Sequence, residues 1–158
     1  MKNSLVWAVF AGLLVAIGYR FARAEDPLSR PPEEARETHL QNLKQLTFGG
    51  QNAEAYFSLD GTKLIFQSTR PPFDCDQIFS MNVDGGDVKL LSSGKGRTTC
   101  GFFFPDGKRF IYGSTHLASD VCPPAPDRSQ GYVWPIYPAY EIFSANVDGS
   151  GSLRLTKK

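Results

Sequence analysis

Histidine is scarce in this chain, and the motifs of common enzymes are missing. Neither His39 nor His116 has cysteine, histidine or carboxylate neighbours at the spacing of a metal site. The Gly-x-Ser-x-Gly elbow of serine hydrolases does not occur. Residues 93–98 mimic a phosphate-binding loop, but the motif's first glycine is absent and Lys95 is followed by glycine. We therefore expect no catalytic residue, no metal and no cofactor, and predict that the protein is not an enzyme.

The chain also lacks an excess of charge and any sustained helical periodicity. Its 17 Lys and Arg residues balance 16 Asp and Glu residues, for a net charge of +1. This near-neutral balance gives no broad positive field, so nucleic acid is not an expected partner. Aromatic residues, glycine and proline are frequent, which favours short strands and tight turns. The sequence therefore predicts an all-β protein.

Residues 1–24 are predicted to be a secretory signal peptide. Lys2 precedes a mostly apolar stretch at 5–19, and residues 22–24 form the small-x-small pattern of a cleavage site before Glu25. An uncleaved membrane anchor is the alternative, but Arg20 leaves the apolar run short for a bilayer span. No cysteine lies near this site, so a lipoprotein is not expected. We expect a periplasmic or secreted protein that meets the membrane only through its signal segment.

The folded part is predicted at 39–158, after a linker at 25–38 that is rich in proline and charge. A repeat organises it, since IFSMNVDG at 78–85 returns as IFSANVDG at 142–149. A second block, FSLDGTKLIF at 57–66, returns in similar form 46 residues later. The first block is 64 residues from its copy, so the second unit carries an insertion of 18 residues (64 − 46). The two repeat units span about 48–92 and 93–156.

Each unit predicts four short antiparallel strands. Asp-Gly pairs at 60, 84, 106 and 148 mark hairpin turns, which explains these carboxylates without a calcium site. The runs at 64–66 and 110–112 are apolar on both alternating faces, as in sheets stacked face to face around an axis. The predicted strands are 54–58, 63–69, 77–83 and 88–92 in the first unit and 99–104, 109–115, 141–147 and 152–156 in the second, with a lone strand before them at 43–47.

The turn Phe-Ser-x-Asp-Gly-x-Lys-Leu-Ile-Phe, followed by Ile-Phe-Ser-Met-Asn-Val-Asp-Gly-Gly and a Leu-Thr-like ending, resembles the WD-related repeat of TolB-like β-propellers. The resemblance covers residues 43–156 and departs at Leu59, where the repeat usually has proline; Pro105 keeps it in the second copy. It implies two four-stranded blades plus the lone strand. Because propellers close with about four to eight blades, we expect a fragment, or self-association that completes the ring. Two uncovered apolar faces should make the isolated chain oligomeric, aggregated or poorly folded.

The resemblance also implies a function. We expect a non-catalytic exported module that binds or scaffolds a protein partner in the cell envelope. The alternative is the N-terminal propeller of a prolyl-oligopeptidase-like hydrolase whose catalytic domain is missing, because such enzymes share these repeats. A Gly-x-Ser-x-Gly motif further along the reading frame would favour the hydrolase, and further blades would favour the binding module.

Three segments are expected on one face of the blades, at 70–76, at 95–100 and in the insertion at 116–140. In an up-and-down blade, the connection between the second and third strands opens on the same side as the connection into the next blade. The insertion is rich in Tyr and Trp, which anchor interfaces, although the same rings could simply pack the loop onto its blade. The candidate binding residues on this face are Arg70, Asp74, Asp76, His116, Tyr132, Trp134 and Tyr137.

The three cysteines, Cys75, Cys100 and Cys122, all fall on this predicted face. Export places them in an oxidising compartment, where three cysteines allow one bridge and leave one thiol. We expect a Cys100–Cys122 disulfide, which would tie the insertion to its own blade. A Cys75–Cys100 bridge is the first alternative, and three unpaired cysteines are the second.

Overall fold

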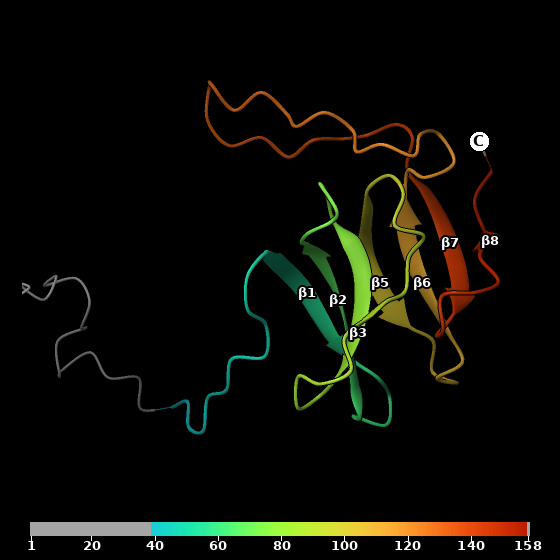
Figure 1. Cartoon of the computed structure of the whole chain (residues 1–158). Helices are drawn as coiled ribbons and strands as arrows, with labels where there is room; N and C mark the ends of the chain where they lie inside the picture. Colours follow the sequence, from blue (N-terminus) through green and yellow to red (C-terminus); the bar gives the residue numbers. More distant parts are fainter. Residues whose placement is uncertain (1–38, 158) are drawn as a thin grey trace, which may run out of the picture. The chain divides into compact units, whose positions relative to one another are not determined.

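A computed structural model describes residues 39–157 of the chain, and eight strands form two separate antiparallel sheets (Figure 1). No helix occurs in this range, so none is present that could cross a membrane. The all-β prediction of two four-stranded blades is confirmed. The predicted signal peptide at 1–24 and the linker at 25–38 lie outside the described residues. The strands in chain order are β1 (Gln51–Phe57), β2 (Lys63–Thr69), β3 (Gln77–Asn82), β4 (Lys89–Leu90), β5 (Thr98–Phe103), β6 (Arg109–Ser114), β7 (Glu141–Asn146) and β8 (Leu153–Arg154).

Each sheet follows chain order, β1-β2-β3-β4 in the first and β5-β6-β7-β8 in the second. The Asp-Gly turns act as the sequence predicts. Asp60 accepts a hydrogen bond from the backbone N–H of Thr62 (3.0 Å), and Asp106 does the same for Lys108 (2.9 Å). Each carboxylate thus accepts a hydrogen bond within its own turn.

The inner and outer strands differ slightly from the predicted ranges. β1 and β5 each contain a bulge, at which Glu54 and Cys100 adopt positive φ angles of 52° and 54°. The outer strands β4 and β8 are only two residues long, shorter than predicted.

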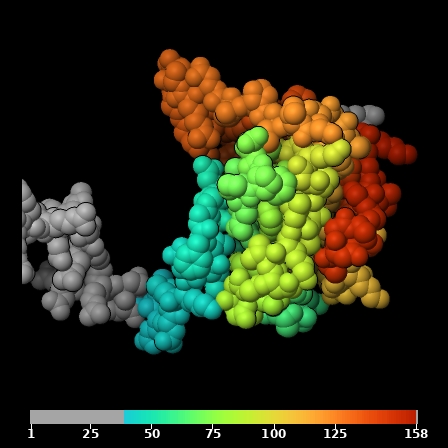
Figure 2. Space-filling model, viewed as in Figure 1, coloured from blue at the N-terminus to red at the C-terminus, as the bar shows by residue number. Residues whose placement is uncertain are grey.

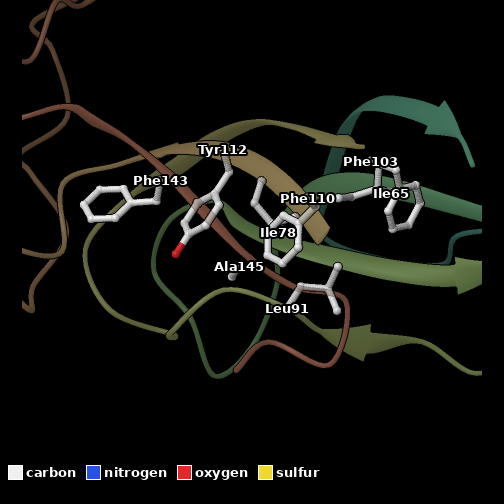
Figure 3. Close-up of a cluster of buried hydrophobic side chains, with 8 residues drawn as sticks. All are labelled: Ile65, Ile78, Leu91, Phe103, Phe110, Tyr112, Phe143 and Ala145. Atoms are coloured by element: carbon white, nitrogen blue, oxygen red, sulfur yellow. The ribbon is translucent and has the colours of Figure 1, made fainter. Parts of the chain in front are cut away.

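The core lies between the two sheets, which pack face to face. Ile65 and Ile78 of the first sheet are fully buried in one cluster with Phe110, Tyr112 and Phe143 of the second (Figure 3). A second cluster lies on the other face of the first sheet, where Leu46 and Phe73 pack against it. Both faces of the middle strands of the first sheet are therefore apolar and covered, as the two-sided apolar run at 64–66 predicted. The second cluster consists of Leu64, Phe66, Phe79 and Met81.

The lone strand predicted at 43–47 is not formed. In the described part of the chain, residues 43–47 form no backbone hydrogen-bond ladder with another strand. Lys44 donates a hydrogen bond to the carbonyl of Asp84 (2.7 Å), and Leu46 packs against the second cluster. The segment therefore contributes side-chain contacts, not a fifth strand.

Candidate functional site

The site is built by the long connection between β6 and β7, residues 115–140, which contains no strand. It reaches across the end of both sheets and forms an arm over them (orange in Figures 1 and 2). Its first part is held to the connection between β4 and β5. The N–H of Gly96 donates to the carbonyl of Asp120 (2.8 Å), and Lys95 forms an ion pair with the same residue (2.8 Å). The three segments predicted to share one face therefore meet.

A disulfide fixes this arrangement, but it is not the predicted one. The bridge joins Cys75 of the first sheet's loop to Cys122 of the insertion, with the Cα atoms 5.9 Å apart. Cys100, predicted as the partner of Cys122, is an exposed free thiol. It already belongs to β5, and its side chain contacts Thr99 (3.3 Å) instead of the loop. The predicted Cys100–Cys122 pair and the alternative Cys75–Cys100 pair are both wrong, because the bridge ties the insertion to the neighbouring blade.

Beneath the arm lies a hollow of about 460 Å³, which we call the loop hollow. Its walls come from the arm and from the ends of both sheets, so it exists only because these segments are held together. The arm supplies aromatic rings and prolines, and the sheets supply polar groups. The residues that line it are Gln51, Thr69, Arg97, Thr99, Ala125, Pro126, Arg128, Tyr132, Trp134, Pro135, Tyr137 and Tyr140.

Arg97 supplies the charge at the base of the loop hollow. Its backbone is fixed by two hydrogen bonds with Thr115, at 3.0 Å and 2.9 Å. Its guanidinium lies 3.7 Å from a carboxylate oxygen of Asp76 and 5.8 Å from the ring centre of Tyr137. Among the described residues, Arg97 Nε is the one buried side-chain nitrogen or oxygen without a hydrogen-bond partner. A ligand could not reach this buried nitrogen, but the positive charge of Arg97 in the wall of the hollow would favour an anionic or carbonyl-bearing ligand.

Two tyrosines complete the base. Burial raises the pKa of Tyr140 to about 12, and the nearby Arg97 only partly offsets that effect. The hydroxyl of Tyr140 is therefore neutral at physiological pH and can donate a hydrogen bond. Tyr137 donates its own hydroxyl proton to the carbonyl of Pro124 (3.0 Å), which holds its ring in place beside Tyr140.

The outer part of the arm faces solvent. Tyr132, Trp134 and Ile136 are 74%, 76% and 89% exposed. Arg128 stacks over the ring of Tyr132 at 5.6 Å. These large rings form an apolar surface on a segment that the disulfide already restrains. A partner that binds there would therefore cost less conformational entropy than one that binds a free loop.

The predicted site residues separate into two groups. Tyr132, Trp134 and Tyr137 line the loop hollow, with Asp76 behind Arg97. Arg70 does not join them, because it bonds to Ser68 and Asn52 (2.9 Å and 2.8 Å) and stacks on the second cluster. Asp74 is exposed and lies outside the lining. Sequence reasoning missed Arg97 and Arg128, for which the available signal was a cation next to the glycine and aromatic residues of these loops.

His116 is not part of the loop hollow. Its Nδ1 lies 2.7 Å from the hydroxyl of Ser114, and its ring packs on Phe143 (4.4 Å between centres). Burial lowers the pKa of His116, so the ring is neutral near pH 7. Ser114 as a whole is only 1% exposed, so a substrate could not reach its hydroxyl. The pair is a local packing arrangement at the end of β6.

The free thiol of Cys100 lies beside Glu54, its counterpart in the first repeat. Burial raises the pKa of the Cys100 thiol, and contact with the Glu54 carboxylate raises it further. The thiol is thus a poor nucleophile at neutral pH. No group of three or more metal-ligating side chains lies together in residues 39–157.

A second hollow, of about 910 Å³, opens at the opposite end of the sheets between their hairpin turns. Its charged side chains already have hydrogen-bond partners within the protein. Asp60 is bonded within its own turn, and Lys63 bonds to Asn82 (3.0 Å). It lacks the concentration of rings found under the arm, so we place the candidate site in the loop hollow.

The comparisons with known proteins support the fold. No family model and no curated protein matches the sequence. Among solved structures, TolB from Acinetobacter baumannii is 24% identical, with a TM-score of 0.51, over 72% of this chain and 23% of that protein. A protein described as a TolB from Agrobacterium tumefaciens is 23% identical, with a TM-score of 0.49, over 72% of this chain and 33% of that one. The chain thus spans a third or less of these proteins, and its described sheets have the fold of two neighbouring blades of a TolB-like β-propeller.

Proposed function

We propose that this chain is a non-catalytic, exported binding module that holds a protein partner of the cell envelope at the loop hollow. The observation that carries the proposal is the tethered arm, which is fixed at Cys122 yet exposes Tyr132 and Trp134. Aromatic residues with few rotamers are the usual anchors of protein interfaces. These rings are 74% and 76% exposed, so they contribute little to packing the loop onto its own blade.

The chemistry of the hollow indicates which part of a partner it takes. Arg97 and Arg128 provide positive charge, while Asp76 compensates one of them only at 3.7 Å. The neutral hydroxyl of Tyr140 adds a donor. An extended, acidic segment of a partner would offer carboxylate and carbonyl acceptors to these groups and apolar side chains to the rings.

Export is supported by the pairing of Cys75 with Cys122, because such bridges persist in oxidising compartments. The N-terminal sequence points the same way. Fractionation of the producing cells and mass spectrometry of the mature chain test this part. We expect a periplasmic or secreted protein that starts at Glu25 and carries one disulfide; a reduced chain in the cytosol would contradict it.

Binding is tested by site-specific photocrosslinking of the full chain in the producing cells. A benzoylphenylalanine at position 134 should give one discrete adduct with another protein. The control position is Leu59, which is 79% exposed on the opposite hairpin end. Addition of Arg97→Ala should weaken the adduct from position 134. Equal adducts from both positions, or none from position 134, would contradict the proposal.

A further inference from the structure

The loop hollow is rich in side chains that can donate a hydrogen bond to a ligand. Arg97 and Arg128 are cations in its wall. Arg128 has no carboxylate partner among the described residues, and its guanidinium lies 5.6 Å from the ring centre of Tyr132. Tyr140 and Trp134 add a hydroxyl and an indole N–H, and neither group forms a hydrogen bond within the described part of the chain. A ligand in the hollow therefore meets donors on several side chains.

Acceptors for a ligand are scarce in the same hollow. None of the described residues that line it is Asp or Glu. Asp76, which lies behind Arg97, accepts a hydrogen bond from Thr69 (2.7 Å) and faces Arg97 at 3.7 Å. The side-chain acceptors that remain in the wall are uncharged oxygens, such as that of Gln51. An N–H group that a ligand brought into the hollow would give up its hydrogen bonds to water and meet no carboxylate, which is costly.

A proline-rich peptide segment has the opposite imbalance. Proline has no backbone N–H, whereas its carbonyl group remains an acceptor. A run of prolines therefore offers acceptors to the donors of the hollow and brings few donors that would need a partner. Such a run also holds the extended polyproline II conformation before it binds, so it loses little conformational entropy on binding.

The arm provides the flat surfaces on which proline rings can pack. Trp134 and Tyr137 both line the hollow. The hydroxyl of Tyr137 donates to the carbonyl of Pro124 (3.0 Å), and its ring centre lies 6.0 Å from that of Tyr140. The disulfide at Cys122 restrains the arm, so these rings are held near the hollow before a ligand arrives. Grooves lined by aromatic rings are the usual binding sites of polyproline II segments.

We propose that the loop hollow binds a proline-rich, acidic segment of the partner protein in the polyproline II conformation, an inference that rests on the proposed function. The prolines pack on the rings of Trp134 and Tyr137. The hydroxyl of Tyr140 donates to a carbonyl of the segment. Arg128 pairs with an acidic side chain beside the prolines. The prolines thus match the rings and the shortage of acceptors, and the acidic residue matches the charge.

Peptide binding to the full chain tests the two parts of this preference separately. Fluorescence anisotropy compares labelled peptides that repeat Pro-Pro-Glu, Pro-Pro-Gln or Gly-Gly-Glu. The second peptide lacks the charge, and the third lacks the prolines. The Pro-Pro-Glu peptide should bind about tenfold more tightly than the Gly-Gly-Glu peptide and several-fold more tightly than the Pro-Pro-Gln peptide. Equal binding of the Pro-Pro-Glu and Gly-Gly-Glu peptides, or no binding of the first, would overturn the proposal.

Variants of the chain assign the preference to the loop hollow. Trp134→Ala should weaken binding of the Pro-Pro-Glu peptide about tenfold. Phe48→Ala, which removes a 79% exposed ring outside the hollow, should not. Arg128→Gln should abolish the preference for Pro-Pro-Glu over Pro-Pro-Gln, whereas Lys108→Gln, at an exposed turn between β5 and β6, should keep it. Equal losses in the two ring variants, or a preference that survives Arg128→Gln, would overturn the assignment.

Tyr140→Phe tests the hydrogen bond to the ligand carbonyl, because it keeps the ring and removes only the hydroxyl. It should weaken the Pro-Pro-Glu and Pro-Pro-Gln peptides several-fold and by the same factor, since both have the same backbone. Unchanged binding of both peptides would show that Tyr140 does not donate to the ligand.

Mass spectrometry of the adduct from position 134 separates this inference from the proposed function. The partner segment attached to the benzoylphenylalanine should contain prolines next to an acidic residue. An adduct on a segment without proline would overturn the inference and leave the proposed function standing. Absence of any adduct from position 134 would contradict the proposed function itself, and this inference with it.

Discussion

The two sheets are copies of one repeat that differ mainly in the connection between their middle strands. In the first sheet this connection is residues 70–76; in the second it is 115–140. The flanking strands keep the same register, with Lys63 opposite Asn82 and Arg109 opposite Asn146. The strands and hairpin turns therefore specify the blade independently of this connection. The connection is free to vary, which is why the candidate site lies there.

The sheets also differ in what covers them. Ile78 lies between two sheets, whereas its counterpart Ile142 has solvent on one side. The same residue type at the same strand position thus has a different surrounding. This difference separates the contribution of the repeat from that of the neighbouring blade.

The largest expected effect is the loss of stability when the buried Ile78 is truncated, compared with the same change at the exposed Ile142. Ile78→Ala should destabilise the chain by about 2–5 kcal/mol, since it removes a fully buried side chain and leaves a cavity. The matched variant Ile142→Ala should cost less than about 1 kcal/mol, because that side chain is 38% exposed. Urea unfolding followed by circular dichroism at low protein concentration measures both. Equal losses would contradict the internal interface.

The next effect concerns the tether of the arm. Replacing both Cys75 and Cys122 by serine should lower the free energy of unfolding by about 2–4 kcal/mol, because the bridge closes a loop of 47 residues. Limited proteolysis should then cut within 116–140 while both sheets persist. Cys100→Ser is the control and should change neither result. Protection of the arm without the bridge would show that the arm packs by itself.

A smaller effect is expected on acidification. The pKa of His116 is lowered by burial below its ordinary value of about 6.5, so the unfolded chain binds this proton more readily than the folded one. The contribution of His116 is therefore fully present above pH 6.5 and declines as the pH falls toward the folded pKa. His116→Gln should flatten the stability profile between pH 7 and pH 5. An identical profile for both chains in calorimetry would contradict the assignment.

The smallest expected effect comes from the ion pair between Lys95 and Asp120, which lies beside the disulfide. Lys95 and Asp120 are 56% and 65% exposed, so water and salt screen their attraction. Lys95→Ala should lower the free energy of unfolding by only about a few tenths of a kcal/mol, and this difference should disappear in high salt. Its proteolysis pattern should match that of the unmodified chain. Release of the arm in this variant would mean that the ion pair, not the disulfide, positions the site.

Much of the fold could be predicted because its signals are local. The Asp60-Gly61 turn bonds to its own residues, and the two-sided apolar run at 64–66 needs covering on both faces wherever it lies. The site was less predictable. Tyr132 and Trp134 were expected from their residue type, but Arg97 gave no strong signal in the sequence, since its importance comes from the rings that the arm brings to it.

Local patterns in the sequence were enough to predict most strands, the hairpins and the two stacked blades, because turn chemistry and apolar alternation act over a few neighbouring residues. Tertiary structure alone decided that Cys75 and not Cys100 bonds to Cys122, and that Arg70 packs on its own sheet while Arg97 lies under the arm. These outcomes depend on distances between segments far apart in the chain. Such distances are set by how one sheet packs on the next, and no local pattern records them.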